Sequence, residues 1–405
     1  MKPLASFLLS AGVFACGLLA TSRGATAPVA EESEPAGFHT LQLGDAAPDF
    51  SLPGVDGKRY SLADFKGASE LMVIFLCNHC PVSHAAETRL IPFVARMKGK
   101  SVAVVAINPN NDQGLQIDEL GYTKYGENFE GSKAHAQESG FNFPYLYDGD
   151  TQAVAKAYGC LTTPHVFIFD RDRHLRYKGR FDDSDLLDAA TVHAPDAINA
   201  MLALVDGKPV PVAETRPVGC STKWSGKATV VAEFDAAWKK LPVTVAPIDA
   251  AGVAELAHNT TDKLRVINLW ATWCVPCAAE FPALVMESQR FMRRDFELIT
   301  ISMDDPKLQP NVLRFLTKQH AAVPPKTQPA VLQEGRTTNN YLYTGGAADA
   351  MAKALDPQWP GPLPYTVVIA PGGQILARWN GPIDPTEFQN KITDLLGGFR
   401  HRSQM

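Results

Sequence analysis

Short apolar runs and a helix-like segment outline the first half of the chain. Two apolar runs, at 71–76 and 102–107, flank a helix-like stretch at 83–98, and this order predicts a βαβ unit with parallel strands. Further on, the runs at 166–169 and 175–179 flank a polar turn and predict an antiparallel hairpin. The pattern therefore predicts an α/β fold with a mixed β-sheet.

The same order of elements occurs twice. In each half an apolar run ends at a Cys-x-x-Cys pair, at 77–80 and at 274–277, and a helix-like stretch follows. Downstream of the pairs, Pro164 and Pro364 each stand directly before another apolar run. Because the pairs and the prolines recur in the same order at nearly the same separation, the sequence indicates a duplication that serves dithiol redox chemistry.

The composition is that of a soluble globular protein. The chain has 405 residues, enough for two domains with separate cores, and is 45% apolar and 20% charged. A net charge of -5 gives no reason to expect a nucleic-acid partner. The sequence has no glycine-rich phosphate loop, zinc-spaced cysteine quartet or hydrolase triad motif, so we expect no metal and no organic cofactor.

Residues 1–27 are typical of a secretory signal peptide. Lys2 precedes an apolar stretch at 4–20 that is too short and too poorly flanked for a stable membrane span. Cleavage would discard Cys16 and leave 28–38 as a flexible leader, whereas the alternative of a lipoprotein keeps Cys16 as a lipid-bearing N-terminus. Either way we expect an exported protein without an integral span, in the oxidising periplasm or cell envelope.

The cysteine spacing favours a redox switch over a structural bridge. A Cys-x-x-Cys bridge encloses too few residues to constrain the unfolded chain much. Where a helix begins at such a pair, the first sulfur faces unpaired backbone N–H groups and the positive end of the helix dipole, which stabilise its thiolate. We therefore predict that the first cysteine of each pair is the nucleophile.

The second half resembles a known redox group. The stretch from Asn268 to Pro282 is similar to the active site of the TlpA and ResA group of thioredoxin-like proteins, and the resemblance covers most of 241–400. It implies a thioredoxin fold, with Cys274 as the attacking thiol, Cys277 as the resolving thiol and Pro364 as a cis-proline that faces them.

Three neighbours complete this predicted site. The backbone of Leu363, turned by the cis-proline, would pair with an extended substrate chain. Glu280 matches the glutamate of the same group; partly removed from water, it would have a raised pKa and exchange protons with a thiol, and the alternative is a solvated surface carboxylate. Trp273 is expected to cover the site and pack beside it.

The segment 305–362 departs from the pattern of that group. It is long, contains Pro324-Pro325 and has a helix-like stretch at 339–355. Because insertions of this size in a compact domain tend to be functional or flexible, we predict a lid that selects partners.

The first half resembles the AhpC/TSA and redoxin group. The resemblance covers 39–225 and leaves 226–240 as a linker. It implies a second thioredoxin-fold domain, so the chain would hold two in tandem, each a central mixed sheet flanked by helices. The segments that carry it are 44–52, 75–81 with its Cys-Asn-His-Cys-Pro signature, and 163–170.

This resemblance makes Cys77 and Cys80 the expected redox pair and Thr163 with Pro164 the expected substrate-binding loop. A thiol peroxidase with antioxidant activity is an alternative, because Cys80-Pro81 stands where a peroxidatic cysteine would stand. A peroxidatic site requires a hydroxyl residue three positions before the peroxidatic cysteine to hold the peroxide. Here Cys77 occupies that position before Cys80.

His79 predicts a difference in redox poise between the two pairs. A histidine can place positive charge beside a thiolate and stabilise the reduced form, whereas Pro276 supplies no charge. Electrons would then flow from the second pair toward the first. The alternative is an ordinary solvent-facing side chain for His79.

Cys160 and Cys220 lie outside the pairs. They are auxiliary redox candidates: they would form one disulfide, or Cys220 would relay electrons from its place near the linker. A buried small-residue role is equally open for Cys160.

Together these features predict an exported thiol–disulfide oxidoreductase. Its partners would be protein thiols and disulfides together with an upstream electron donor. Besides the peroxidase, a metallochaperone that holds Cu(I) on the paired thiolates near His79 is an alternative.

Overall fold

A computed structural model describes residue 35 and residues 38–397. The expected signal peptide at 1–27, Cys16 and nearly all of the expected leader lie outside these residues. Within the described part of the chain, no helix has the length and apolar character needed to cross a membrane.

The first sheet has five strands. They are β3 (Glu70–Phe75), β4 (Val102–Asn108), β5 (Tyr145–Tyr147), β7 (His165–Phe169) and β8 (Leu175–Gly179). Their order is β5-β4-β3-β7-β8, with β3 parallel to β4, β4 parallel to β5, and β7 antiparallel to both β3 and β8. The predicted βαβ unit and hairpin are confirmed.

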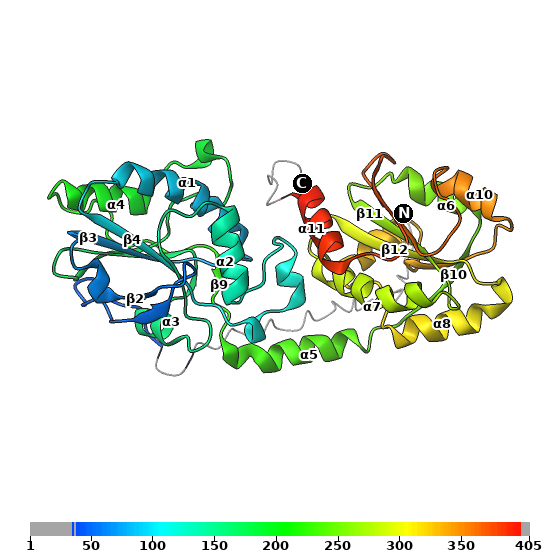
Figure 1. Cartoon of the computed structure of the whole chain (residues 1–405), viewed down its shortest axis with the longest axis horizontal. Helices are drawn as coiled ribbons and strands as arrows, with labels where there is room; N and C mark the ends of the chain where they lie inside the picture. Colours follow the sequence, from blue (N-terminus) through cyan, green and yellow to red (C-terminus); the bar gives the residue numbers. More distant parts are fainter. Residues whose placement is uncertain (1–34, 36–37, 398–405) are drawn as a thin grey trace, which may run out of the picture. The chain divides into compact units, whose positions relative to one another are not determined.

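Alternation along β3 divides the first core into two layers. Met72 and Ile74 pack with apolar residues of α1 (Pro81–Met97) and α4 (Asp196–Val205), which cover one face of the sheet (Figure 1). The side chains between them, such as Val73, pack on the other face against α3 (Ala153–Tyr158) and the hairpin of β1 (Ser51–Pro53) and β2 (Arg59–Ser61). Because both faces are covered, β3 is apolar along nearly its whole length.

The second sheet has six strands. They are β10 (Ala246–Ile248), β11 (Leu264–Trp270), β12 (Phe296–Ser302), β13 (Asn340–Tyr343), β14 (Tyr365–Ile369) and β15 (Ile375–Asn380). Their order is β10-β13-β12-β11-β14-β15, parallel from β10 to β11 and antiparallel from β11 to β15. The predicted α/β class with mixed sheets is thus present in both halves.

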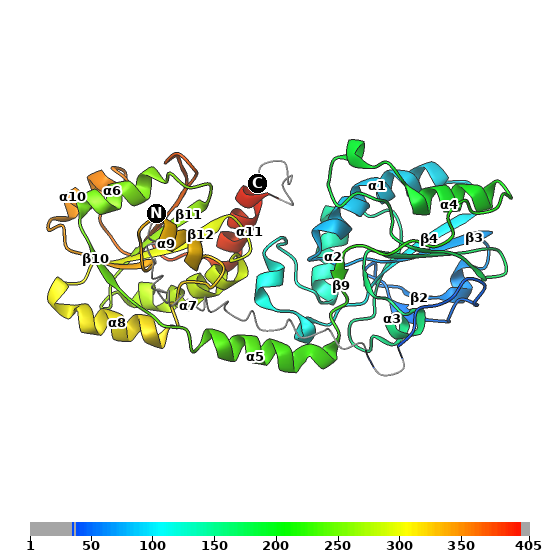
Figure 2. The same cartoon turned by 180° about the vertical axis from the view of Figure 1, so that it is seen from behind.

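Helices cover both faces of this sheet as well. Leu264 and Val266 of β11 contact α7 (Val275–Arg290) and α11 (Pro385–Leu396), and Trp270 on the same face contacts α8 (Gln309–Lys318). Ile267 and Leu269 face α6 (Ala250–His258) and α10 (Ala348–Leu355). Figure 2, the view from behind, shows the same layers.

Two predictions about the segment 305–362 are wrong. The segment 305–362 is not a lid, because β13 is an inner strand of the sheet and Met351 and Leu355 of α10 are core residues. The predicted helix at 339–355 begins instead as β13, and only its second part is helical. Within the predicted linker 226–240, residues Ala228–Trp238 form the helix α5, whose Trp238 belongs to the apolar cluster around Trp270.

The remaining elements are short. The helices are α2 (Phe129–Glu138) and α9 (Gln328–Gln333), and the strands are β6 (Thr162–Thr163) and β9 (Cys220–Ser221). The 3-10 turns are η1 (Leu62–Phe65), η2 (Asp112–Gly114), η3 (Ile117–Leu120), η4 (Ala189–Thr191), η5 (Ser225–Lys227) and η6 (Pro306–Leu308).

Candidate active site

The cysteine pair of the second half lies where α7 begins. Cys274 is the N-cap residue, and Val275-Pro276 form the first turn, where a proline costs no helical hydrogen bond. Cys274 and Cys277 form a disulfide, and the Cys277 backbone N–H donates to Cys274 Sγ over 3.3 Å. The expected placement of the first sulfur at a helix N-terminus is confirmed for this pair.

The surroundings of the disulfide are partly open to solvent. Cys277 is buried and Cys274 is 5% exposed, whereas Trp273 is 66% exposed and Val275 is also exposed. That Trp273 covers the site and packs beside it stays a prediction. Trp270 takes the interior position instead, where its ring contacts Phe281. Trp273 leaves a large aromatic surface next to the disulfide available to a partner.

Glu280 is held inside the second half. One carboxylate oxygen accepts from Asn268 Nδ2 over 3.1 Å, and the other accepts from the Ile383 backbone N–H over 2.8 Å. Burial raises the pKa of Glu280, and the two hydrogen bonds oppose this effect. The alternative of a solvated surface carboxylate is excluded, because Glu280 is only 6% exposed.

The proline loop of the second half lies beside this pair. The Leu363–Pro364 peptide bond is cis, as expected. Leu363 packs against the apolar cluster that contains Cys274 and Cys277. The Pro364 carbonyl accepts from the Gly381 backbone N–H over 3.0 Å, which fixes the start of β14 against the end of β15.

The first half differs in where its helix begins. The N-cap of α1 is Cys80, and Pro81 is the first helical residue, so Cys77 lies three positions before the N-cap. The prediction that the first cysteine meets the helix N-terminus is wrong here. Cys77 Sγ instead accepts a hydrogen bond from Thr163 Oγ1 over 2.9 Å and lies 3.8 Å from Ser83 Oγ.

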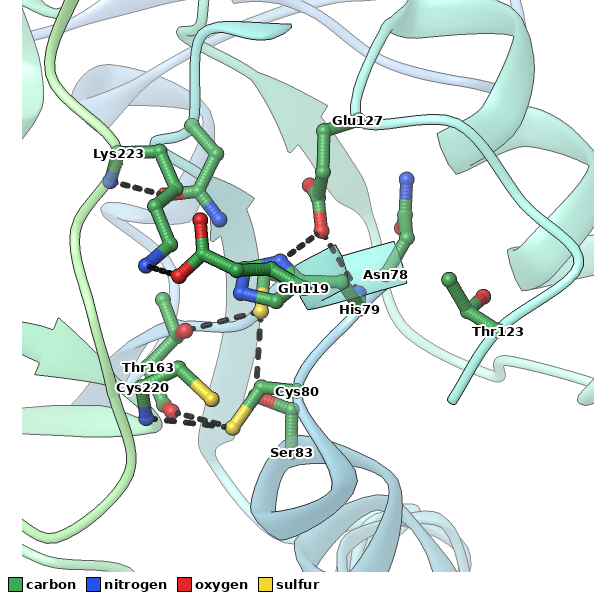
Figure 3. Close-up of polar contacts among 12 residues, drawn as sticks. Asn78, His79, Cys80, Ser83, Glu119, Thr123, Glu127, Thr163, Cys220 and Lys223 are labelled. Atoms are coloured by element: carbon green, nitrogen blue, oxygen red, sulfur yellow. Dashed lines mark hydrogen bonds and ion pairs between the residues drawn. The ribbon is translucent and has the colours of Figure 1, made fainter. Parts of the chain in front are cut away.

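His79 turns into the interior and pairs with Glu127. His79 Nδ1 is 2.5 Å from Glu127 Oε1, and the same oxygen accepts from the His79 backbone N–H over 2.7 Å. The other oxygen of Glu127 accepts from Asn108 Nδ2. His79 is 2% exposed, so the solvent-facing alternative is excluded. Figure 3 shows His79 and Glu127 side by side.

This pairing changes which groups carry charge. Burial opposes a charge on His79, but the neighbouring Cys77 and Glu127 raise the pKa of His79 from 6.5 to about 10. Burial also works against ionised Glu127, yet the charge of His79 holds the pKa of that carboxyl low. Burial raises the pKa of Cys77. The site therefore holds a His79–Glu127 ion pair next to Cys77.

Glu127 is a site residue that the sequence did not indicate. It directly precedes Asn128, the N-cap of α2, and lies 47 positions after Cys80 in sequence. No motif or regular spacing links it to the cysteine pair. Only a three-dimensional arrangement could single it out among the acidic residues of this irregular stretch.

The second sulfur of the first half faces the proline loop. The Thr163–Pro164 bond is cis, the Cys80 thiol donates to the Thr163 carbonyl over 3.2 Å, and the Cys220 backbone N–H donates to Cys80 Sγ over 3.3 Å. Burial and a hydrogen bond with the Cys220 side chain raise the pKa of Cys80 to about 12. Figure 3 shows Thr163, Cys80 and Cys220 gathered at this point.

The alternative of a disulfide between Cys160 and Cys220 is excluded. Both cysteines are free. Cys160 is fully buried in the apolar cluster under β3, where its thiol donates to the Thr162 carbonyl and lies 3.4 Å from Thr222 Oγ1. The pairing of β9 with β6 brings Cys220 to Cys80 instead.

Two clusters in the described residues have the side chains of a metal site. Ligand atoms of Cys77, His79 and Glu127 lie within 4.8 Å of one another, as do those of His84, Glu87 and His135. In the first cluster the ion pair already uses His79 Nδ1 and one oxygen of Glu127. In the second, both ring nitrogens of His135 have hydrogen-bond partners. Both clusters are thus connected internally by hydrogen bonds.

These features define the class of protein. In each half the strand at the centre of a mixed sheet leads into a Cys-x-x-Cys segment and a helix, with a cis-proline loop before the antiparallel strand beside it. This is the arrangement of a thioredoxin-like redox domain, present twice. The AhpC/TSA family profile matches residues 43–178 and 240–378, and the chain belongs to the AhpC/TSA family.

Several characterised proteins are similar to parts of the chain. The thiol:disulfide interchange protein HelX of Rhodobacter capsulatus is 28% identical over 164 residues, 40% of this chain and 78% of HelX. The thiol:disulfide interchange protein DsbE of Vibrio cholerae is 26% identical over 181 residues, 44% of this chain and 81% of DsbE. Among solved structures, a hypothetical protein of Sinorhizobium meliloti is 37% identical, with a TM-score of 0.41, over 46% of this chain and 97% of that one.

Proposed function

We propose that the protein is a thiol–disulfide oxidoreductase that exchanges disulfides with protein partners. The observation that carries the proposal is the Cys274–Cys277 disulfide at the N-terminus of α7, with Cys277 N–H directed at Cys274 Sγ. Hydrogen bonding and the helix dipole at this point favour a thiolate on Cys274 once the bridge is open. The names of HelX and DsbE as thiol:disulfide interchange proteins support the same activity.

The reaction follows from the two sulfurs. In the reduced pair, the Cys274 thiolate attacks a disulfide of the partner, which forms a mixed disulfide and releases one partner thiol. Cys277 then attacks Cys274 Sγ, closes the Cys274–Cys277 bridge and releases the second partner thiol. The partner gains two electrons and the pair loses two, so an upstream dithiol donor must reduce the pair again.

Glu280 and Trp273 have separate roles in this proposal. Glu280, whose pKa burial raises, is the acid–base group that takes and returns the proton of a thiol of the pair. Trp273, exposed beside the disulfide, contacts the partner together with the backbone of Leu363. Electrons are carried by cysteines alone, so the mechanism requires no organic cofactor.

The first half performs related chemistry with Cys77 and Cys80. The positive charge of the His79–Glu127 ion pair lies next to Cys77 and favours a thiolate there when the pair reacts. Pro164 and Thr163 lie beside the sulfurs of this pair. Export to the periplasm or cell envelope is part of the proposal, and the sequence pattern of 1–27 supports it.

The structure gives the alternatives less support. A peroxidatic cysteine must ionise near neutral pH, whereas burial and the Cys220 contact raise the pKa of Cys80 to about 12.

A Cu(I) carrier would hold the ion on Cys77 with its neighbours, and stoichiometric copper retained after anaerobic reduction would favour this function.

The proposal is tested by reduction of insulin with dithiothreitol as donor. We expect the full-length protein to accelerate the reaction and the Cys274→Ser variant to lose most of the acceleration. A Cys277→Ser variant should accumulate mixed disulfides with its partners, because the resolving sulfur is missing. Equal activity of the Cys274→Ser variant and the unmodified protein would contradict the assignment.

A further inference from the structure

The chain covers its own proline loop in the first half. β9 pairs antiparallel with β6, and Cys220 stands directly opposite Thr163, the residue before Pro164. An extended partner of a thioredoxin-like site would pair with this same stretch of backbone. In the second half, Leu363 lies outside every strand of the described residues, so no strand of that part pairs with the corresponding position.

A glycine allows this close approach. A Cβ atom on Gly219 would lie 2.0 Å from the Thr163 carbonyl oxygen and 3.0 Å from the ring of Pro164. Any other residue would force β9 away from the proline loop. The segment is therefore shaped for contact with Thr163 and does not merely pass over it.

The contact brings three sulfur-bearing residues together. The Cys220 backbone N–H donates to Cys80 Sγ over 3.3 Å. Their sulfur atoms are next to each other in Figure 3. Thr163 joins the two sulfurs of the pair, because its hydroxyl donates to Cys77 Sγ and its carbonyl accepts from the Cys80 thiol. Cys80 thus contacts Cys220 directly and is joined to Cys77 through Thr163.

Burial distinguishes the three thiols. Cys77 and Cys80 are 0% exposed, whereas Cys220 is only half-buried. A disulfide on another molecule cannot reach a fully buried sulfur in line, as thiol–disulfide exchange requires. Val218, two residues before Cys220, is exposed and lines, together with Pro164, a cavity of about 200 Å³. Access to the first pair therefore runs past β9.

From these contacts we propose that Cys220 is a third redox thiol, which passes disulfides between an external partner and the buried Cys77–Cys80 pair. This inference rests on the proposed thiol–disulfide exchange function. The partner is a disulfide that approaches along β9, and Cys220 is the sulfur that it meets first.

The exchange balances at each step. The Cys220 thiolate attacks the partner disulfide, and a mixed disulfide forms as one partner thiolate leaves. Cys80 attacks Cys220 Sγ, which forms the Cys80–Cys220 bond and releases the second partner thiolate. Cys77 then attacks Cys80 Sγ, and its proton goes to the leaving Cys220 thiolate. The Cys77–Cys80 bond forms and Cys220 is free again, with two electrons transferred to the partner.

The test uses the full-length chain with Cys274→Ser and Cys277→Ser, so that only the first half reacts. Glutathione disulfide is the oxidant, and acid quenching, alkylation and peptide mass mapping give the rate at which the Cys77–Cys80 disulfide forms. We expect Cys220→Ser to lower this rate at least about tenfold, because the accessible sulfur is lost. The matched Cys160→Ser variant should stay within about twofold of the parent.

A second variant traps the intermediate. With Cys77→Ser the last exchange is blocked, and a Cys80–Cys220 disulfide should accumulate in nearly all of the oxidised protein. The relay would be overturned if the Cys77–Cys80 disulfide formed as fast in Cys220→Ser as in the parent, or if Cys77→Ser gave no Cys80–Cys220 bridge. The proposed exchange function would stand in either case. If no disulfide forms among the three cysteines of the parent, the relay and the proposed redox role of this half both fail.

Discussion

At the scale of single residues, the two cysteine pairs share a motif but have different surroundings. Cys274 caps its helix, lies beside an exposed tryptophan and is bonded to Cys277. Cys77 lies outside its helix and next to a buried His79–Glu127 ion pair. The chemistry of each sulfur is thus set by neighbours that the Cys-x-x-Cys spacing does not specify.

The ion pair predicts a dependence of stability on pH. The pKa of His79 is raised from 6.5 to about 10 in the folded protein. The stabilisation that the ion pair gives to the folded state is therefore complete below about pH 6.5 and is lost as the pH rises through about 10. Replacing Glu127 with Gln leaves a buried histidine without its charged partner and should lower the free energy of unfolding by about 3 kcal/mol at pH 6.

Urea unfolding under reducing conditions at pH 6 and pH 9 measures this effect. The difference between Glu127→Gln and the unmodified protein should shrink at the higher pH. Glu130→Gln is the control, because Glu130 lies three residues after Glu127, in the first turn of α2, and is exposed. A difference that is independent of pH would show that Glu127 does not hold a proton on His79.

Glu280 predicts a pH dependence of the exchange rate. Burial raises the pKa of Glu280, so part of its carboxyl group stays protonated above pH 4.5. The protonated carboxyl can donate a proton to a thiolate of the pair. Glu280→Gln should slow disulfide exchange by about tenfold to a hundredfold and remove the corresponding inflection from the pH profile between pH 4 and 8. The exposed Glu255→Gln serves as control. An unaltered profile would assign Glu280 a structural role only.

Trp273 predicts a loss of partner binding without a loss of stability. Because the side chain is 66% exposed, Trp273→Ala should change the free energy of unfolding by less than about 0.5 kcal/mol. Reduction of insulin should slow several-fold, while reduction of a small disulfide such as hydroxyethyl disulfide stays unchanged. If both substrates were affected equally, Trp273 would act on the cysteines and not on the partner.

At the scale of elements, β9 is the feature that separates the first half from the second. It is two residues long and joins the proline loop by the pairing of Cys220 with Thr163. Gly219→Ala places a Cβ against the Thr163 carbonyl and should destabilise the protein by about 1 to 3 kcal/mol. As β9 moves away, alkylation of Cys80 by iodoacetamide should become faster.

Gly226 supplies the control for this prediction. A Cβ added there meets no atom within 4 Å, so Gly226→Ala should leave both stability and alkylation unchanged. Equal alkylation of Cys80 in Gly219→Ala and in the unmodified protein would mean that β9 does not shield the site.

Elements with a strong local pattern could be predicted from the sequence. The runs of β3, β4, β7 and β8 are continuously apolar or bounded by a polar turn, and these strands form as expected. The helix positions after the cysteines follow from the same periodicity. Their exact starts do not, because Pro81 and Pro276 both suit a first helical turn and place it at different offsets from the first cysteine.

Elements that depend on distant partners could not be predicted. β13 and β9 are short, and only pairing with strands far away in sequence makes them strands. The same limit applies to the site, where Glu127 meets His79 across 48 positions and Cys220 meets Cys80 across 140. A cysteine without a motif carries no local sign of its partner, which explains the incorrect Cys160–Cys220 bridge.

At the scale of the whole molecule, the duplication gives two cysteine pairs with different access to solvent. The second pair has a disulfide with exposed neighbours, whereas the first lies under β9. The predicted flow of electrons from the second pair to the first stays a prediction, because His79 favours the reduced form while burial opposes a Cys77 thiolate. Redox potentials of the two pairs in the full-length protein would measure the difference.

Reversible opening of the Cys274–Cys277 disulfide in the folded protein tests the central claim most directly. A full-length variant with Ser at 77, 80, 160 and 220 is equilibrated in dithiothreitol redox buffers, quenched in acid, alkylated and mapped by mass spectrometry. We predict that the pair opens and closes completely while the far-UV circular dichroism spectrum of the fold persists. A bridge that opens only when the protein unfolds would contradict a redox function for this site.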